Sequence, residues 1–228
     1  METATSAEDL AEVQMALGGG GLGTGAVAGV GAGGGSAASA SVVFSNGASY
    51  FGTRDAQISS TSPATNFGQT TSCASAGGEV ARSCLIKWDL SSVPANAIVD
   101  FAYVRLDVHD GSVATFDIHQ VNGAWEELSV NWTQRDATHI WTGPGCNSTP
   151  SDRTSAPVAR FVGTSGLRTI TLNGLGPAMI QNWLVNPSAN KGIIIRNATG
   201  TLDSLGVHSS NYSVASLRPT LGFTYHLP

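Results

Sequence analysis

Charged residues are scarce in this chain of 228 residues. Asp, Glu, Lys and Arg make up 12% of it, Lys and Arg together number 11, and the formal net charge is -5 at pH 7. A surface that holds a nucleic-acid backbone needs many clustered cations. The composition therefore excludes nucleic acid as an expected partner, and it gives little support to a ligand rich in uronate charge.

Long apolar runs and a conventional signal peptide are also missing. No stretch of about 18 apolar residues occurs, so the sequence predicts no membrane span. The N-terminus has no basic segment followed by an apolar one. Residues 1–19 are acidic and end in Gly18-Gly19, which resembles the double-glycine leaders cut by peptidase-containing exporters. A plain acidic tail is the alternative interpretation.

The motifs of common enzyme classes are absent as well. The sequence has no nucleophile elbow, no His-Glu zinc helix and no phosphate-binding loop. The acidic doublet Glu126-Glu127 would point to opposite faces of a strand and so could not act as a paired acid and base. The sequence therefore predicts a protein that is not an enzyme.

Metal-binding patterns are weak. Asp55 and Asp89 lie near predicted strand ends, where a structural calcium ion would find oxygen ligands, but no EF-hand spacing accompanies them. His109 and His119 are expected on outward faces without metal-site spacing. We expect no cofactor, with calcium at Asp55 or Asp89 as the alternative.

Only three cysteines are present. If Gly78-Glu79 forms a two-residue hairpin turn, Cys73 and Cys84 face each other across a strand pair, at a separation that a disulfide can bridge. Such a bond predicts an oxidising, extracellular compartment. Cys146 is then left over, and we expect it to be buried as a small apolar residue.

Strand patterns dominate the rest of the chain. Residues 82–108 predict strand, turn and strand, and the second strand alternates with Ala102, Val104, Leu106 and Val108 on one face. The segment 173–187 is the one convincing helix. At this length we expect one all-β sandwich with one short helix.

The glycine-rich segment 20–45 cannot build a core of its own, so it predicts an extended N-terminal arm. We expect this arm to add a strand to a neighbouring copy of the chain or to fill a groove there. Packing on its own domain is the alternative. The candidate contact residues are Gly21, Leu22, Val27, Val30, Val42, Val43 and Phe44.

Aromatic residues indicate a second candidate function for the surface, which is stacking on a sugar. Trp125 and Trp132 flank a short extended segment and are expected in the core. Trp141 lies in a long loop without periodicity, residues 138–156, where functional residues often occur. It is the candidate for stacking on a sugar ring, with Asn147 and Asp152 as polar neighbours.

Several separated blocks together resemble the DNRLRE-type domain, a relative of disaggregatase-associated modules. They are an Asp-led strand before a loop (Asp55, Pro63, Asn66, Gly68), LIKWDLSSVPANAIVDFAYVRLDV, AWEELSVNWT, MIQNWLVNPSANKGIIIRN, and HSSNY with RPTLGFTY. The resemblance covers about residues 50–226. It implies a jelly-roll-like, extracellular, non-catalytic domain, here residues 46–228, in a family with carbohydrate-binding members.

Two functions follow from these patterns. The first is a secreted structural or adhesive subunit at the cell surface, which forms a filament or layer with other copies of itself through the arm. The alternative is a carbohydrate-binding module that docks a polysaccharide through its loops. The arm and the sparse charge favour the first.

Overall fold

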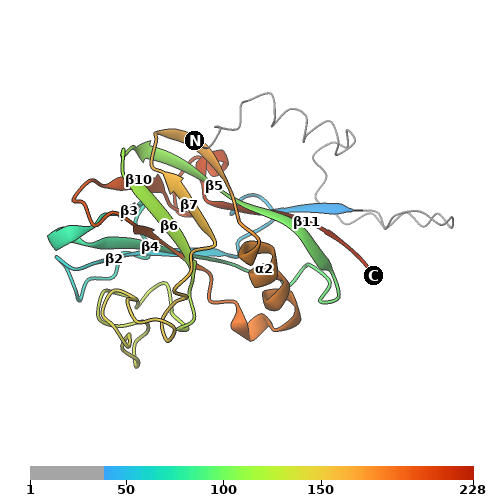
Figure 1. Cartoon of the computed structure of the whole chain (residues 1–228), viewed down its shortest axis with the longest axis horizontal. Helices are drawn as coiled ribbons and strands as arrows, with labels where there is room; N and C mark the ends of the chain where they lie inside the picture. Colours follow the sequence, from blue (N-terminus) through green and yellow to red (C-terminus); the bar gives the residue numbers. More distant parts are fainter. Residues whose placement is uncertain (1–38) are drawn as a thin grey trace. The chain divides into compact units, whose positions relative to one another are not determined.

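Alternating apolar residues place strand β5 (Ile98–Asp110) on the core of the protein. The computed structural model describes residues 39–228, and residues 1–38 lie outside the described part. Ala102, Val104, Leu106 and Val108 are all buried, as the alternation predicts. The described residues form two antiparallel sheets (Figure 1). The predicted all-β sandwich is therefore confirmed.

Strand β5 is the centre of the first sheet, sheet A. The order there is β1 (Ala40–Phe44), β11 (Thr220–His226), β5, β10 (Leu205–His208) and β3 (Ser72–Ser75), and β8 (Gly166–Thr171) pairs with the other side of β5. Sheet B has the order β2 (Thr53–Ser59), β4 (Arg82–Trp88), β9 (Ile193–Asn197), β6 (Thr115–Gln120) and β7 (Ala159–Val162).

One α-helix occurs among residues 39–228. Helix α2 (Leu175–Val185) contains Pro177 in its first turn and ends just before Pro187, as the sequence predicts. It packs Met179, Ile180 and Trp183 into the main core between the sheets. Three short 3-10 turns, η1 (Gly78–Val80), η2 (Pro187–Ala189) and η3 (Ala215–Leu217), complete the described elements. No helix in this part of the chain is long and apolar enough to cross a membrane.

Sheet B is buried on both of its faces. Its inner face joins the main core, and a second apolar cluster lies on its outer face. Residues 121–156, which we call the cover, supply one half of this second cluster and lie beside the sheet (Figure 1). Burial on both faces explains why β9 contains three consecutive isoleucines, Ile193–Ile195, all at most 1% exposed. The second cluster comprises Ala56, Ile58, Leu85 and Ile194 of sheet B and Val121, Trp125, Val130, Trp141 and Cys146 of the cover.

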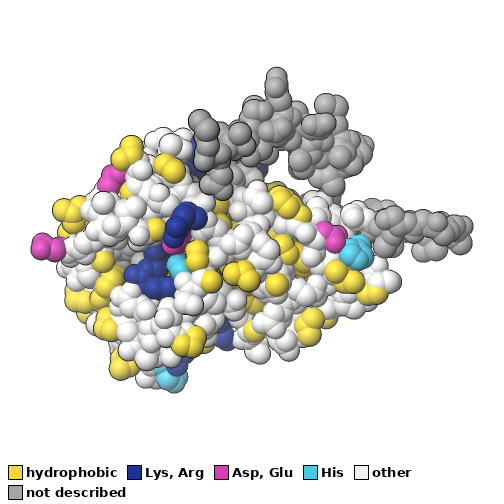
Figure 2. All heavy atoms as spheres, viewed as in Figure 1, with side chains coloured by type: hydrophobic (Ala, Val, Ile, Leu, Met, Phe, Trp, Pro, Cys, Tyr) yellow, Lys and Arg dark blue, Asp and Glu magenta, His cyan; other side chains and the backbone are white. Residues whose placement is uncertain are grey.

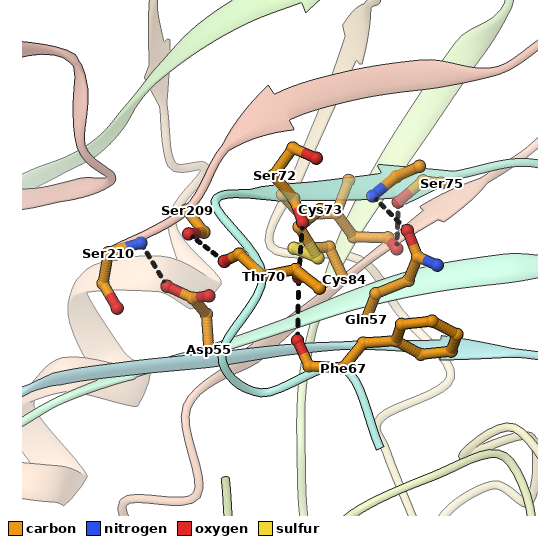
Figure 3. Close-up of a disulfide and its surroundings, with 12 residues drawn as sticks. Asp55, Gln57, Phe67, Thr70, Ser72, Cys73, Ser75, Cys84, Ser209 and Ser210 are labelled. Carbon is orange, nitrogen blue, oxygen red and sulfur yellow. Dashed lines mark hydrogen bonds between the residues drawn. A yellow bond between two sulfur atoms is a disulfide. The ribbon is translucent and has the colours of Figure 1, made fainter. Parts of the chain in front are cut away.

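The disulfide Cys73–Cys84 joins the two sheets (Figure 3). The pairing agrees with the prediction, but the predicted hairpin is wrong. Cys73 lies in β3, which pairs with β10 in sheet A, whereas Cys84 lies in β4 of sheet B. Turn η1 and the contact of Gly77 with Thr201 turn the chain from one sheet to the other. Cys146 is free and buried, as expected.

Strand β1 is part of this sandwich. Val42, Val43 and Phe44 pair with β11 of the same chain, and the Phe44 ring stacks on Phe223 at 5.8 Å between centroids. The expectation that these three residues join a neighbouring copy is therefore corrected, and the sandwich begins at Ala40 instead of residue 46. The other arm candidates, Gly21, Leu22, Val27 and Val30, and the leader-like residues 1–19 lie outside the described residues.

Asp55 of β2 forms a buried hydrogen bond with the segment that follows β10. It is 2% exposed, and its carboxylate accepts a hydrogen bond from the backbone N–H of Ser210 at 2.6 Å (Figure 3). Burial, opposed by the Ser210 hydrogen bonds, raises the pKa of Asp55 from its usual 3.8 to about 6. The carboxylate is thus a structural link between β2 and the segment after β10.

Removing the disulfide should loosen the two sheets from each other. We expect the double variant C73S/C84S to lose about 2–4 kcal/mol of unfolding free energy. Urea unfolding of the oxidised protein and the variant measures this loss. In C146A, which keeps the disulfide, a reducing agent should destabilise the protein as it does the wild type. Equal midpoints for the oxidised wild type and C73S/C84S would contradict the structural role of the bond.

The pKa of Asp55 predicts a pH dependence of stability. Because the folded-state pKa is raised above the unfolded value, the stabilisation by proton binding is complete below about pH 4 and is lost as the pH rises through about 6. Each unit by which the folded and unfolded pKa values differ corresponds to about 1.4 kcal/mol of unfolding free energy. Between pH 4 and 7 we therefore expect the unfolding free energy of the wild type to fall by about 3 kcal/mol relative to that of D55N. Urea unfolding at several pH values measures this, and parallel curves for the two proteins would refute it.

Candidate functional site

Trp141, the predicted sugar-stacking residue, is not available to a ligand. It is 1% exposed, and its indole N–H donates to the backbone oxygen of Asn131 at 3.0 Å. The prediction is wrong because the long loop is part of the cover and buries its largest side chain against sheet B. Of its two proposed neighbours, Asn147 is exposed and Asp152 is buried.

Asp152 organises the cover from inside. Its carboxylate accepts hydrogen bonds from the backbone N–H groups of Thr142 and Gly143, at 2.9 and 2.8 Å, and from that of Ser148 at 3.1 Å. A segment without regular structure must satisfy its buried N–H groups in some other way, and one carboxylate does so here for three of them. Asp152 therefore shapes the loop.

A row of charged side chains crosses the outer face of sheet B beyond the cover. Arg160 of β7 and Arg196 of β9 both lie directly opposite Asp117 of β6 in the strand register. Arg160 holds Asp117 with two hydrogen bonds, of 2.7 and 2.9 Å. The carboxylate is thereby committed to one of its two neighbouring guanidinium groups.

A third guanidinium group joins this row from the cover. Arg153 donates to the backbone oxygen of Thr154 at 3.0 Å and contacts the Nδ1 atom of His119 at 3.5 Å. Its Nε is buried and has no partner among the described residues. Arg196 donates only to the backbone oxygen of Cys146, at 3.4 Å. Within residues 39–228, neither Arg153 nor Arg196 forms an ion pair.

Burial, and then neighbouring positive charge, lowers the pKa values of two residues in this group. Burial, followed by the charge of Arg153, lowers the pKa of Arg196 to about 10. Burial and then Arg153 also lower the pKa of His119, which disfavours its protonated form. We call Arg153, Arg160, Arg196, Asp117 and His119 the arginine cluster. Figure 2 shows basic side chains gathered with an acidic and a histidine side chain at one place on the molecule's face.

His119 itself lies on the outer face, as the sequence predicts, but is only 6% exposed. The structure therefore corrects the prediction of a surface histidine. His109, by contrast, is exposed as expected.

A cleft lies between helix α2 and the end of the cover. Its volume is about 460 Å³. The arginine cluster and this cleft use consecutive residues, because Gln120 follows His119 and Thr154 follows Arg153. The cleft is lined by Gln120, Pro150, Thr154, Ser155, Ala156, Val158, Leu175, Ala178, Met179 and Asn182.

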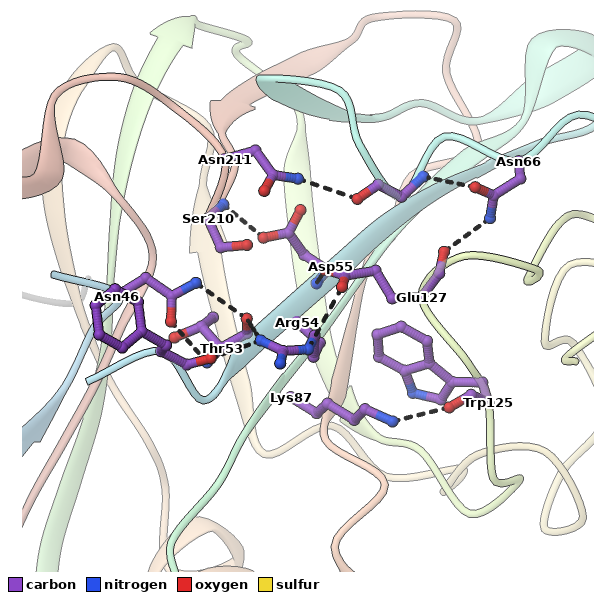
Figure 4. Close-up of polar contacts among 12 residues, drawn as sticks. Asn46, Thr53, Arg54, Asp55, Asn66, Lys87, Trp125, Glu127, Ser210 and Asn211 are labelled. Carbon is purple, nitrogen blue, oxygen red and sulfur yellow. Dashed lines mark hydrogen bonds and ion pairs between the residues drawn. The ribbon is translucent and has the colours of Figure 1, made fainter. Parts of the chain in front are cut away.

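A second, charged pocket of about 310 Å³ lies where the cover meets β2 and β4 (Figure 4). Lys87 donates to the backbone oxygen of Trp125 at 2.8 Å and lies 4.7 Å from the centre of its ring. Arg54 pairs with Glu127 at 3.5 Å, and Glu127 also accepts the backbone N–H of Asp55. The ion pair of Arg54 with Glu127 and the hydrogen bond from Lys87 to Trp125 attach the cover to the sheet.

Aromatic rings lie on the outer face of sheet A, where Phe101 is exposed and Tyr103 is half-buried. Phe101 and Tyr103 lie 6.3 Å apart, and Tyr212 stacks on His208 at 3.6 Å. The charged partner on this face is already engaged, since His208 pairs with Asp107 at 2.7 Å. Arg105, on the same face of β5, donates to the Thr220 hydroxyl at 3.5 Å and forms no ion pair within residues 39–228.

The calcium candidates do not form a metal site. Asp55 binds the Ser210 backbone, and Asp89 accepts the N–H of Ser91 at 2.9 Å. No group of three or more His, Cys, Asp or Glu residues suited to a metal occurs in the described part of the chain. Both carboxylates serve as local backbone acceptors.

Comparison with known proteins gives one match. Residues 47–156 match the family described as Carbohydrate-binding module family 96. This range runs from the turn before β2 to the end of the cover, and it includes Asp117, His119 and Arg153 of the arginine cluster. No curated protein matches the chain. About half of the chain thus resembles a non-catalytic module that binds carbohydrate.

Proposed function

We propose that this chain is a non-catalytic carbohydrate-binding module and that its arginine cluster holds the acidic groups of a polysaccharide. The observation that carries the proposal is the grouping of three arginines beside β6: Arg160 binds Asp117, Arg196 lies opposite Asp117 in the strand register, and Arg153 contacts His119. The match of residues 47–156 to a carbohydrate-binding family supports the class of ligand.

The chemistry of arginine favours an oxyanion at this place. A guanidinium group presents several N–H donors in a plane, and it binds carboxylate or sulfate through two parallel hydrogen bonds. Arg160 uses this geometry on Asp117. Arg153 and Arg196 keep most of their donors free, so a uronate carboxylate or a sulfate ester would complete their hydrogen bonding and offset their charge.

The open position of the cluster suits a polymer. The side chain of Arg160 is 63% exposed, and the row lies on strand faces at the edge of sheet B. A polysaccharide can pass over such a surface without entering an enclosed pocket. The one carboxylate in the row is held by Arg160, which leaves no free pair of carboxylates for glycoside hydrolysis.

This proposal replaces the assembly function that the sequence favours. Val42, Val43 and Phe44 are paired within their own sheet. The family match supports the carbohydrate-binding alternative instead. We further propose that the protein is secreted, because the disulfide between Cys73 and Cys84 is typical of oxidising compartments.

Neutralising the two unpaired arginines should weaken binding of acidic polysaccharides. We expect R153Q and R196Q each to raise the Kd for polygalacturonate or for a sulfated galactan at least about tenfold, since a hydrogen bond to a charged group contributes about 1.5–3 kcal/mol. The wild-type affinity should also fall as salt rises. Isothermal titration calorimetry with both polymers measures these values and distinguishes the carboxylate from the sulfate.

R168Q is the matched control. Arg168 is an exposed arginine in β8 of sheet A, outside the cluster, so its loss changes the net charge equally. Thermal unfolding should give similar melting temperatures for all three variants. If R168Q weakens binding as much as R153Q and R196Q do, net charge and not the cluster is responsible, and the proposed site is wrong.

A further inference from the structure

The cleft beside helix α2 contains hydrogen-bonding groups that have no partner within the described residues. The side-chain amide of Gln120 forms no hydrogen bond there, and the amide nitrogen of Asn182 donates none, although the Asn182 oxygen accepts one from Asn186. The Gln120 amide can therefore both donate and accept, and the Asn182 nitrogen can donate, to adjacent hydroxyl groups of a ligand.

The floor of the same cleft is apolar. Val158 and Met179 are buried at its base, and Leu175 at its rim is 52% exposed. No side chain that lines the cleft carries a charge. A ligand that matches this lining is neutral, has one apolar face and carries hydroxyl groups at its edge. The volume of about 460 Å³ lies in the range of small-molecule sites.

The cleft and the arginine cluster are joined through the backbone. His119 of the cluster precedes Gln120 of the cleft in β6, and Arg153 of the cluster precedes Thr154 of the cleft. Arg153 also donates to the backbone oxygen of Thr154 at 3.0 Å. Consecutive strand residues point to opposite faces of a sheet, so His119 and Gln120 face different sides. An extended ligand would reach both places by passing over residues 153–154, which lie beside Gln120 and Val121.

We infer that this cleft binds a neutral sugar residue of the same polysaccharide whose acidic residue is held by the arginine cluster. The inference rests on the proposed function, and it names the ligand more closely as a heteropolysaccharide with both acidic and neutral residues. A polymer made only of uronate would use the cluster and leave the cleft unfilled.

The test fills the cleft without changing the core. Ala178 is exposed on α2 and lines the cleft, so A178W should block it. V185W is the matched control, because Val185 is exposed on the same helix two turns later and does not line the cleft. N182A removes one free amide. Calorimetry with gellan, xanthan, hyaluronan, polygalacturonate and a neutral galactomannan gives the affinities, and thermal unfolding checks the fold.

We expect at least one of the three mixed polymers, gellan, xanthan or hyaluronan, to bind the wild type about tenfold more tightly than polygalacturonate does, which corresponds to one or two additional hydrogen bonds. A178W should abolish this difference and N182A should reduce it, while V185W keeps it. Binding of polygalacturonate should stay unchanged in all three variants.

The inference is wrong if no mixed polymer binds more tightly than polygalacturonate. It is also wrong if A178W and N182A bind every polymer as the wild type does. A third contradicting result is that A178W weakens the binding of polygalacturonate as much as that of the mixed polymers. The proposed function fails separately, if R153Q and R196Q leave polygalacturonate binding unchanged. If only galactomannan binds and A178W abolishes that binding, the cleft stands as a neutral-sugar site and its link to an acidic residue is wrong.

Discussion

The need to bury the outer face of sheet B is the constraint on which this structure depends. Leu85 and Ile194 would face water if the sandwich had only two layers, and each is instead fully buried under residues of the cover. Burial of one such side chain contributes about 1.5–3 kcal/mol, so the cover is held mainly by apolar contact. Its irregular backbone then requires internal acceptors, and Asp152 provides one for three N–H groups.

This arrangement also determines where polar side chains reach solvent. Cover residues pack on β2, β4 and β9, whereas the row formed by Arg160, Asp117 and Arg196 lies toward the β6–β7 side of the sheet. Arg153 comes directly after Asp152, so the carboxylate that folds the loop also fixes the start of the segment that carries this guanidinium group. Asp152 thus contributes both to the stability of the cover and to the position of Arg153 in the candidate site.

Local patterns predicted the elements well, since they depend on residues close in sequence. The alternation in β5 and the limits of α2 were readable in this way. The pairing of Cys73 with Cys84 was predicted correctly, but from a hairpin that the structure does not contain. The burial of Trp141 could not be predicted from local patterns, because it depends on a sheet face formed by distant strands. The candidate site was equally hidden: Asp117, Arg160 and Arg196 are far apart in sequence, and only the strand register brings them into one row. The alternation of residues 115–120 indicates that Asp117 points outward, but not what lies beside it.

The composition of the whole chain is a poor guide to the proposed acidic ligand for a related reason. A net charge of -5 describes the whole chain, whereas a bound oxyanion responds to the charges within its own neighbourhood. At physiological ionic strength, exposed charges farther away than about 8 Å are largely screened. Asp203, for instance, bonds to Ser112 at the β5–β6 turn, and Asp100 pairs with His226 at the start of β5. Such carboxylates enter the total but lie outside the arginine row. A protein with few cations can still group three of them, two through the strand register and one, Arg153, from the cover.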